Sequence, residues 1–337
     1  MHFIVTGGAG FIGSHITEQL LSEGHYVTVV DNLSTGSLQN LPKHSHLKIL
    51  QKDVLLCQPQ DFPEPIDGIA HLAATPSVAT SWLQPLSVHH NNLSATIAVI
   101  ELCKTLNIPR LVFASSAAVY GNPTQLPITE TQQTSPISPY GLQKLVSEQY
   151  ASLFAQELGI SFIGLRLFNV FGPRQLPNSQ YSGVISIFLS AIQQGLPITI
   201  YGDGSQTRDF IYVKDIANGF VKALTATLTS GSSLIFNLGT GKSTSLMQLV
   251  DYLKIYFPQW QSHLKLAPAR LGDIQHSTAD ISKASSLLSF EPQWSTQSAL
   301  ELFIASLHAT DPKKNITMQT AKVVHYSNIG SYNNSKC

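Results

Sequence analysis

The chain has 337 residues, of which 43% are hydrophobic and 12% are charged, and its formal net charge is zero. This length accommodates one large α/β domain together with a smaller lobe. The neutral charge balance excludes the basic footprint of a nucleic-acid-binding protein, and no apolar run reaches the length needed to span a membrane.

The first predicted element is a strand that leads through a glycine-rich turn into a helix. The apolar run 3–6 is followed by glycines at the spacing G-x-x-G-x-x-G and by a helix-like segment over 11–22. The first glycine permits a tight turn, the middle one lets a pyrophosphate approach the backbone, and the last lets the helix pack close to the strand. The pattern predicts a dinucleotide-binding turn built from Gly7, Gly10, Phe11, Ile12 and Gly13.

A second apolar run, over 26–30, ends at Asp31, about 20 residues after the turn, where a carboxylate binds an adenosine ribose 2′-OH. A carboxylate at this point repels a 2′-phosphate, which favours NAD over NADP. A turn-forming role for Asp31 is compatible with cofactor binding. No arginine follows, and we expect further cofactor contacts from Asn32, Ser34, Thr35 and Gly36.

Strand-like and helix-like runs alternate through the first half of the chain. Strands are expected at 3–6, 27–30, 47–50, 69–72, 111–114 and 162–165, and helices at 11–22, 88–107 and 140–158. This alternation predicts an α/β fold with a Rossmann-type, doubly wound parallel sheet. Beyond about Gly172 the segments are shorter and richer in Gly and Pro, which predicts a smaller mixed α/β lobe over the carboxyl edge of the sheet.

We therefore expect a cofactor-binding domain over 1–171, interleaved with parts of 205–245 because 210–213 and 234–237 again have strand character. Residues 172–308 are expected to form mainly the substrate-binding lobe, and 309–337 a polar, flexible or loosely packed tail. The three cysteines are unpaired by spacing and the twelve histidines are scattered, which predicts no metal site and a reducing, cytoplasmic compartment. The first strand begins at once, so we expect no signal peptide.

The clearest candidates for chemistry are Tyr140 and Lys144, which are four residues apart at the start of a predicted helix. Ser138 suits the N-cap of that helix and Pro139 its first position. Residues four apart share a helix face, so the ammonium of Lys144 is expected to lower the pKa of the Tyr140 phenol and make it a general base. Ser116 ends an apolar strand and can relay a hydrogen bond between Tyr140 and a substrate oxygen.

In their order along the chain, these motifs resemble those of the extended short-chain dehydrogenase/reductase family, in its nucleotide-sugar epimerase branch. The resemblance extends from Met1 to about Leu307. It is carried by TGGAGFIG at 6–13, Asp53-Val54, HLAA at 71–74, SSAAVYG at 115–121, Tyr140-x-x-x-Lys144, RLFNVFGPR at 166–174, YGDGSQTRDF at 201–210 and RLGD at 270–273.

The resemblance implies a catalytic trio of Ser116, Tyr140 and Lys144, with NAD as cofactor. It implies cofactor contacts from Asp53 and Val54 at the adenine, from Leu72, Ala73, Ala74, Asn91 and Ser115 in the dinucleotide groove, and from Phe168 at the nicotinamide. It implies that the UDP-sugar is held by Asn169, Val184, Tyr201, Arg208 and Arg270, with Asp273 at the uridine ribose. Salt bridges from Arg208 to Asp209 and from Arg270 to Asp273 are the alternatives. A homodimer through a four-helix bundle of 88–107 and 140–158 is also implied.

The reaction is indicated by the two residues immediately after Ser116. Dehydratases of this family carry an Asp-Glu pair there and its decarboxylases a glutamate, whereas this chain has Ala117 and Ala118. We therefore expect a 4-epimerase that works through a transient 4-keto sugar. Ser277 aligns with the residue that gates the C2 substituent, and its small size favours UDP-N-acetylglucosamine and UDP-N-acetylgalactosamine, with UDP-glucose and UDP-galactose as further substrates. A UDP-uronate or dTDP-6-deoxyhexose epimerase, an NADP-dependent reductase, which Asp31 disfavours, and a non-catalytic NAD-sensing protein are the alternatives.

Overall fold

The computed structural model describes residues 1–310 except 64, 177–182, 261–263 and 270–273. Its centre is a seven-stranded sheet in the order β11-β6-β5-β4-β1-β2-β3, and every neighbouring pair is parallel. The strands are β1 (His2–Thr6), β2 (Tyr26–Asp31), β3 (Leu47–Gln51), β4 (Gly68–His71), β5 (Arg110–Ser116), β6 (Ser161–Leu167) and β11 (Ser233–Leu238). The order reverses between β1 and β4, so the predicted Rossmann-type doubly wound sheet is confirmed.

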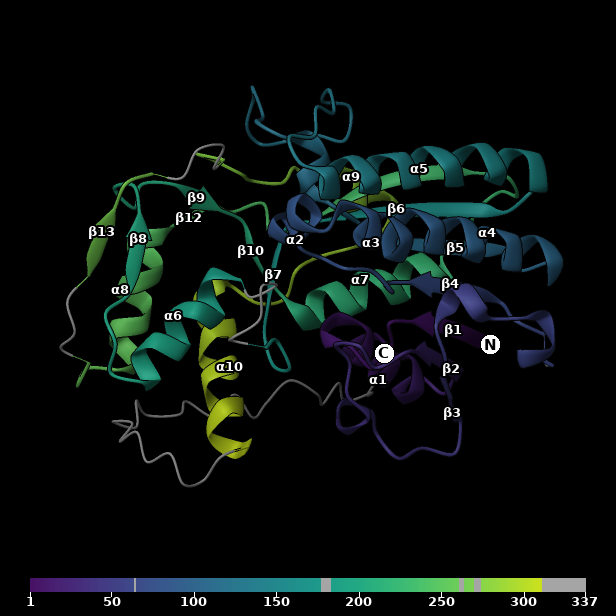
Figure 1. The fold of residues 1–337 in the computed structure, drawn as a ribbon, viewed down its shortest axis with the longest axis horizontal. Helices are drawn as coiled ribbons and strands as arrows, with labels where there is room; N and C mark the ends of the chain where they lie inside the picture. The colour runs from purple at the N-terminus through teal and green to yellow at the C-terminus, as the bar shows by residue number, and fades with distance from the viewer. Residues whose placement is uncertain (64, 177–182, 261–263, 270–273, 311–337) are drawn as a thin grey trace, which may run out of the picture.

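Helices cover both faces of this sheet (Figure 1). One layer contains α1 (Phe11–Ser22), α7 (Val213–Thr225) and α9 (Ser282–Leu288), and the other contains α4 (Ala95–Thr105) and α5 (Pro139–Leu158). Successive residues of a strand point to opposite faces, so Phe3 packs with the first layer and Ile4 with the second. Strands buried on both sides require the continuous apolar runs that the sequence carries.

A second group of elements lies beyond one end of the sheet, on the left of Figure 1. It has its own apolar core, which includes Phe188, Leu249 and Phe303. Its helices are α6 (Val184–Gln193), α8 (Leu246–Tyr256) and α10 (Thr296–Thr310). Its strands pair as β7 (Asn169–Phe171) with β10 (Phe210–Tyr212), β9 (Thr207–Arg208) with β12 (Thr244–Ser245), and β8 (Thr199–Tyr201) with β13 (Lys265–Ala267).

The structure differs from the predicted elements at three places. The predicted helix 88–107 begins earlier, as α3 (Pro85–His89), passes through a π-helical turn, η4 (His90–Ser94), and continues as α4. A short helix, α2 (Val78–Leu83), precedes it. The predicted strand 69–72 ends at His71. The predicted strand 210–213 ends at Tyr212, because Val213 begins α7, and it pairs with β7, whereas β11 joins the main sheet.

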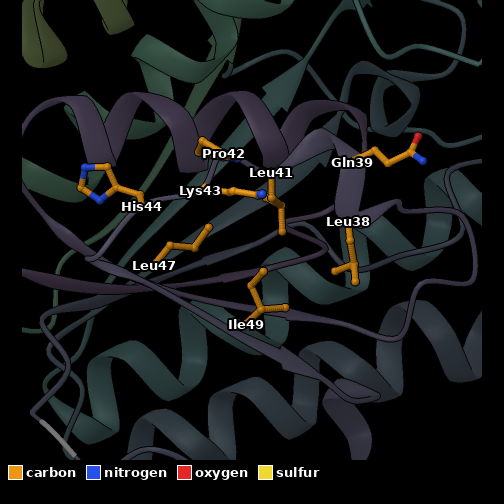
Figure 2. A pocket seen from close by; sticks show the side chains of 8 residues that line it. All are labelled: Leu38, Gln39, Leu41, Pro42, Lys43, His44, Leu47 and Ile49. Carbon is orange, nitrogen blue, oxygen red and sulfur yellow. The ribbon is translucent and has the colours of Figure 1, made fainter.

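Short 3₁₀ turns lie in the loops that follow β2, β3 and β5, namely η1 (Leu38–Asn40), η2 (Val54–Leu56), η3 (Pro59–Asp61) and η5 (Ala117–Tyr120). A pocket of about 640 Å³ lies between η1 and the edge strand β3. Figure 2 shows the side chains that line it, which are Leu38, Gln39, Leu41, Pro42, Lys43, His44, Leu47 and Ile49. None of the predicted site residues lines it. Within the described ranges, no helix is both long enough and apolar enough to cross a membrane, and no cluster of His, Cys, Asp and Glu has the makings of a metal site.

Candidate active site

The turn between β1 and α1 has the geometry of a phosphate-binding cradle. Gly7 adopts φ +68°, and a Cβ there would lie 2.9 Å from the backbone nitrogen of Ala73. A Cβ on Gly13 would lie 2.2 Å from the carbonyl oxygen of Gly7. Gly10 is the N-cap of α1, and neither a side-chain cap nor an acidic residue occupies the first turn of this fully described helix. The first amides of α1 are therefore available to an anion, and the turn fits the pyrophosphate of NAD.

Asp31 ends β2 beside this turn and is buried. Its Oδ2 accepts from the amide of Ala9 at 3.0 Å, and its Oδ1 accepts from the amide of Leu33 at 2.8 Å. A carboxylate has about four acceptor sites, so these two bonds leave capacity for a ribose hydroxyl. The turn-forming and cofactor-binding roles of Asp31 are therefore compatible. Gly36 approaches the same carboxylate, since a Cβ on it would lie 2.9 Å from Oδ2.

The residues predicted to surround the adenine are joined to one another. Asn32 Nδ2 donates to Asp53 Oδ2 at 3.0 Å, and its Oδ1 accepts from the amide of Ser34. Asp53 caps η2, whose first residue, Val54, is buried. Ser34 and Thr35 are exposed in the loop that follows β2.

The opposite wall of the groove is the loop after β4. The amides of Leu72 and Ala73 donate to Thr6 Oγ1 at 3.1 and 3.2 Å, so the end of β1 holds this loop in place. Ala74 follows and is half-buried. Asn91 is exposed and donates to Thr75 Oγ1, whereas its neighbour Asn92 is buried against the same loop. The family resemblance implies Asn91 and not Asn92. The sequence alone does not show in which direction the π-helical turn His90–Ser94 points each of the two side chains.

The residues of the predicted catalytic trio lie at the carboxyl end of β5. Ser138 caps α5 by accepting from the amide of Gly141 at 3.1 Å, so Tyr140 and Lys144 begin the helix as predicted. Lys144 Nζ donates to the carbonyl of Ala114 at 2.7 Å and lies 5.9 Å from the centre of the Tyr140 ring. Ser116 ends β5, and its hydroxyl caps η5 by accepting from the amide of Ala118.

The electrostatics of this pair differ from the prediction that Lys144 lowers the pKa of Tyr140. Burial raises the pKa of the Tyr140 phenol, and the hydrogen bond from Ser116 opposes that shift. Burial also lowers the pKa of Lys144 to about 7, while the carboxylate of Glu148 opposes the decrease. For both groups the dominant influence is desolvation by burial, which disfavours the charged form.

Behind the trio lies a buried ion pair that is not among the residues predicted from the sequence. Arg166 donates from Nε and Nη2 to the two carboxylate oxygens of Glu148, at 3.0 and 2.8 Å. Ser115, predicted to contact the cofactor, is 3% exposed and donates its hydroxyl to Glu148. Glu148 follows Lys144 by four residues, and that spacing could have placed it on the catalytic face of α5.

The residues after β6 leave the main sheet. Phe168 is buried in a small cluster with Val119, Tyr120, Ile128 and Ala279. Asn169 is exposed at the start of β7, and its amide donates to the carbonyl of Asp209. The predicted nicotinamide and diphosphate residues thus stand next to each other where the chain passes from the sheet to the second lobe.

In the second lobe, Arg208 lies on β9 and donates from Nη1 to the carbonyl of Thr207 at 2.9 Å. Its neighbour Asp209 is buried, and its carboxylate accepts from the backbone amides of Thr240, Gly241 and Ala279. Among the residues that the structure describes, no ion pair joins Arg208 to Asp209. The alternative role for Arg208 as a salt-bridge partner of Asp209 is therefore not observed.

Ser277 lies next to β9, where its amide donates to the carbonyl of Thr207 at 3.2 Å, and it is 7% exposed. The structure thus brings Ser277 beside Arg208, although the two are far apart in the sequence. Val184 begins α6 and Tyr201 ends β8 in the same lobe. Arg270 and Asp273 lie outside the described residues.

Comparison with known proteins identifies relatives along almost the whole chain. The model of the NAD dependent epimerase/dehydratase family matches residues 3–239. A UDP-N-acetylglucosamine 4-epimerase from Methanobrevibacter ruminantium, in complex with UDP-N-acetylmuramic acid, is 38% identical with a TM-score of 0.84, over 90% of this chain and 98% of that one. A Thermotoga maritima UDP-glucose 4-epimerase with UDP-glucose is 33% identical with a TM-score of 0.86, over 92% and 99% of the two chains.

A third solved structure is a UDP-glucuronic acid 4-epimerase from Bacillus cereus, in complex with UDP-glucuronic acid and NAD. It is 31% identical to this chain with a TM-score of 0.83, and the match covers 92% of this chain and all of the other. These relatives act at C4 of sugars that differ in their substituents at C2 and C5.

Proposed function

Because the chain belongs to the NAD-dependent epimerase/dehydratase family, we propose that it catalyses the 4-epimerisation of a UDP-hexose through a transient 4-keto sugar. The preferred pair is UDP-N-acetylglucosamine and UDP-N-acetylgalactosamine, and UDP-glucose and UDP-galactose are further substrates. In the proposed cycle NAD is regenerated, so there is no net oxidation and no external cofactor is consumed.

The observation that carries this proposal is the identity of the two residues after Ser116. Ala117 and Ala118 form the first turn of η5, immediately after the catalytic serine and close to α5. Removal of water from a 4-keto sugar needs a base to take a proton and an acid to protonate the leaving oxygen, beyond the trio. Alanine supplies neither, and this supports reduction at C4 as the fate of the keto intermediate.

The roles of the chain's own residues follow from their positions. The chemistry that NAD would supply when bound is hydride transfer from and to C4 of the sugar. Tyr140 removes the proton of the 4-hydroxyl and gives it back after the sugar has turned. Ser116, which is hydrogen-bonded to Tyr140, orients that hydroxyl, and Lys144 places a cationic group one helical turn away. The positively charged nicotinamide ring of NAD, once bound, would add a second charge that favours the phenolate of Tyr140.

Sugar selection is assigned to the second lobe. Arg208 and Arg270 are proposed to hold the diphosphate, since guanidinium groups form bidentate bonds with phosphate oxygens. Asp273 is proposed to bind the uridine ribose, while Asn169, Val184 and Tyr201 contact the nucleotide. Ser277 is small and lies beside Arg208, and this supports a pocket with room for an N-acetyl group.

A UDP-uronate is the second candidate substrate, since the Bacillus cereus relative is complexed with UDP-glucuronic acid. The test is NMR analysis of products after the protein is incubated separately with UDP-N-acetylglucosamine, UDP-glucose, UDP-glucuronic acid and dTDP-rhamnose. We expect products inverted at C4, formed fastest from UDP-N-acetylglucosamine. We expect no dehydrated or decarboxylated product. Inversion of UDP-glucuronic acid alone would establish the second candidate, and no turnover of any sugar would contradict the proposal.

We also propose a homodimer in the cytoplasm. Several large apolar side chains on α3 and α5 are exposed, and the most exposed are Leu86 at 81% and Leu153 at 69%. Leu142, Tyr150 and Phe154 extend the same apolar surface along α5. A patch of this kind on the outer helix layer favours a second copy as the partner.

The described cysteines, Cys57 and Cys103, are buried free thiols, which is compatible with a reducing compartment.

A further inference from the structure

We propose that Asn92 is a positioning residue that couples the dinucleotide groove to the catalytic helix α5. The geometry points to this role because the buried side-chain amide of Asn92 joins the loop after β4 to the turn of α5 that carries Tyr140 and Lys144. The inference deepens the proposed function, on which its turnover measurement rests, whereas its cofactor-affinity measurement is independent of the reaction.

The side chain of Asn92 is 3% exposed and uses its hydrogen-bonding capacity in two directions. Its Oδ1 accepts from the amide of Thr75 at 2.7 Å, and its Nδ2 donates to the carbonyl of Thr75 at 3.3 Å. The same Nδ2 donates to Gln143 Oε1 at 3.0 Å. The amide group thus holds the backbone of the groove loop on one side and a side chain of α5 on the other.

The π-helical turn His90–Ser94 puts Asn92 in this position. A π turn contains one residue more than an α turn, which changes the direction of the side chains within it. Asn91 points outward and is exposed, whereas Asn92 points into the protein. Turns of this kind are frequent at functional sites, because they are maintained only where the altered direction is useful.

A second chain of hydrogen bonds ties the same turn to the groove loop. Thr6 Oγ1 accepts from the amides of Leu72 and Ala73, so its own proton goes to His71 Nδ1, at 2.8 Å. The other ring nitrogen of His71 then donates to Thr96 Oγ1 at 3.3 Å, and Thr96 donates to the carbonyl of Asn92 at 2.9 Å. This tautomer is assigned from the network. Burial and the charge of Lys144 lower the pKa of His71 to about 3, so the ring is neutral near pH 7.

The consequence concerns Gln143, which lies between Tyr140 and Lys144 on α5 and is 8% exposed. Ordering of the groove loop by NAD favours one position of Asn92, and through it one position of α5. By linkage, loss of the Asn92–Gln143 bond must then weaken NAD binding as well as catalysis. The expected size is about fivefold in each, which corresponds to one net hydrogen bond.

The first test is Gln143→Leu, which removes the acceptor and keeps the volume. We expect the affinity for NAD, measured by calorimetry on cofactor-free protein, to fall about fivefold. The value of kcat is expected to fall by a similar factor, while KM for the UDP-sugar changes by less than about twofold, because the nucleotide is held by the second lobe. A purely structural role would lower Tm and leave NAD affinity unchanged.

The second test combines Gln143→Leu with Asn92→Leu in a double-mutant cycle on NAD affinity. We expect the double variant to bind NAD no more weakly than Asn92→Leu alone, since both changes break the same link. Additive losses would mean that Gln143 acts on NAD independently, and they would overturn the proposal. Unchanged NAD affinity in Gln143→Leu would overturn it as well, even if Asn92→Leu failed to fold.

Ser147→Ala is the matched control. Ser147 is buried on α5, one turn beyond Gln143, and its hydroxyl has no hydrogen-bond partner among the described residues. We expect its NAD affinity and kcat to stay within about twofold of wild type. If the wild-type protein binds NAD but turns over no UDP-sugar, the proposed reaction is wrong. The proposed coupling through Asn92 and Gln143 is still tested in that case, by the NAD affinities of the variants.

Discussion

Lys144 donates from Nζ to the carbonyl oxygen of Ala114 at 2.7 Å, and this bond ties α5 to the end of β5. The same ammonium lies 5.9 Å from the centre of the Tyr140 ring. The cation of the trio is therefore held by the sheet, at a constant position relative to the phenol. Because burial lowers the pKa of Lys144 to about 7, its charge in the folded protein changes near neutral pH.

This shift predicts how the stability of the cofactor-free protein depends on pH. Below pH 7 Lys144 is protonated in both the folded and the unfolded chain, and above its ordinary pKa of 10.5 it is neutral in both. Between these values only the unfolded chain binds the proton, so the free energy of unfolding rises with pH. The free energy of unfolding, measured by urea titration, should therefore increase with pH more for wild type than for Lys144→Met. The difference between the two proteins should grow by up to about 1.4 kcal/mol per pH unit over this range. A difference independent of pH would contradict the assignment.

Tyr140→Phe should lower kcat by at least about 10²-fold, because it removes the oxygen that exchanges a proton with the 4-hydroxyl. Binding of NAD and of the UDP-sugar should be nearly unchanged, since the ring remains and the amide of Tyr140 still donates to Ser81 Oγ at 3.1 Å. Steady-state kinetics and calorimetry measure the two quantities. Turnover close to wild type would rule out Tyr140 as the base.

NAD should copurify with the protein, since the proposed cycle never requires its release, and NADP should be absent from the denatured supernatant. Asp31→Asn should reduce the preference for NAD over NADP by at least about tenfold, because it removes the negative charge that faces a 2′-phosphate. The ratio of the two dissociation constants is the proper readout. In this ratio, any general effect of the substitution on the binding of both cofactors cancels. Such an effect is expected because the amides of Ala9 and Leu33 lose a carboxylate partner. A preference for NADP in wild type would refute the assignment.

Ser277→Tyr should suppress kcat/KM for UDP-N-acetylglucosamine far more than for UDP-glucose. The added ring would occupy the space that an N-acetyl group needs and a hydroxyl does not, and a packed pocket relieves such a clash poorly. UDP-glucose serves as the internal control. Equal losses on the two sugars would indicate that Ser277, whose amide bonds the carbonyl of Thr207, has only a structural role.

Leu153→Glu should dissociate the proposed dimer, because it places a charge in the middle of the exposed apolar surface of α5. Leu287→Glu is the matched control, since Leu287 is 57% exposed on α9, in the opposite helix layer. Light scattering at micromolar concentration should give a dimer mass for wild type and Leu287→Glu, and a monomer mass for Leu153→Glu. A monomer mass for wild type would contradict the dimer.

Much of the fold could be predicted because its signals are local. The glycine spacing, the apolar runs and the four-residue spacing of Tyr140 and Lys144 each lie within a few turns of chain. The Ser138 cap was also predicted correctly, since capping is a contact over three residues. The strand β11 was expected, but its place beside β6 at the edge of the sheet depends on pairing over long sequence separations.

By itself, the sequence determined the α/β class and the dinucleotide turn, because periodicity and residue type carry that information directly. The trio of Ser116, Tyr140 and Lys144 stays a prediction. Only the tertiary structure decided the state of Tyr140, whose pKa is raised by burial that no local pattern reports. It also decided that Asn92 rather than Asn91 is buried against the groove loop, and that Glu148 pairs with Arg166 behind Lys144. These relationships arise from desolvation and from contacts between distant segments, and such terms exist only once the chain has packed.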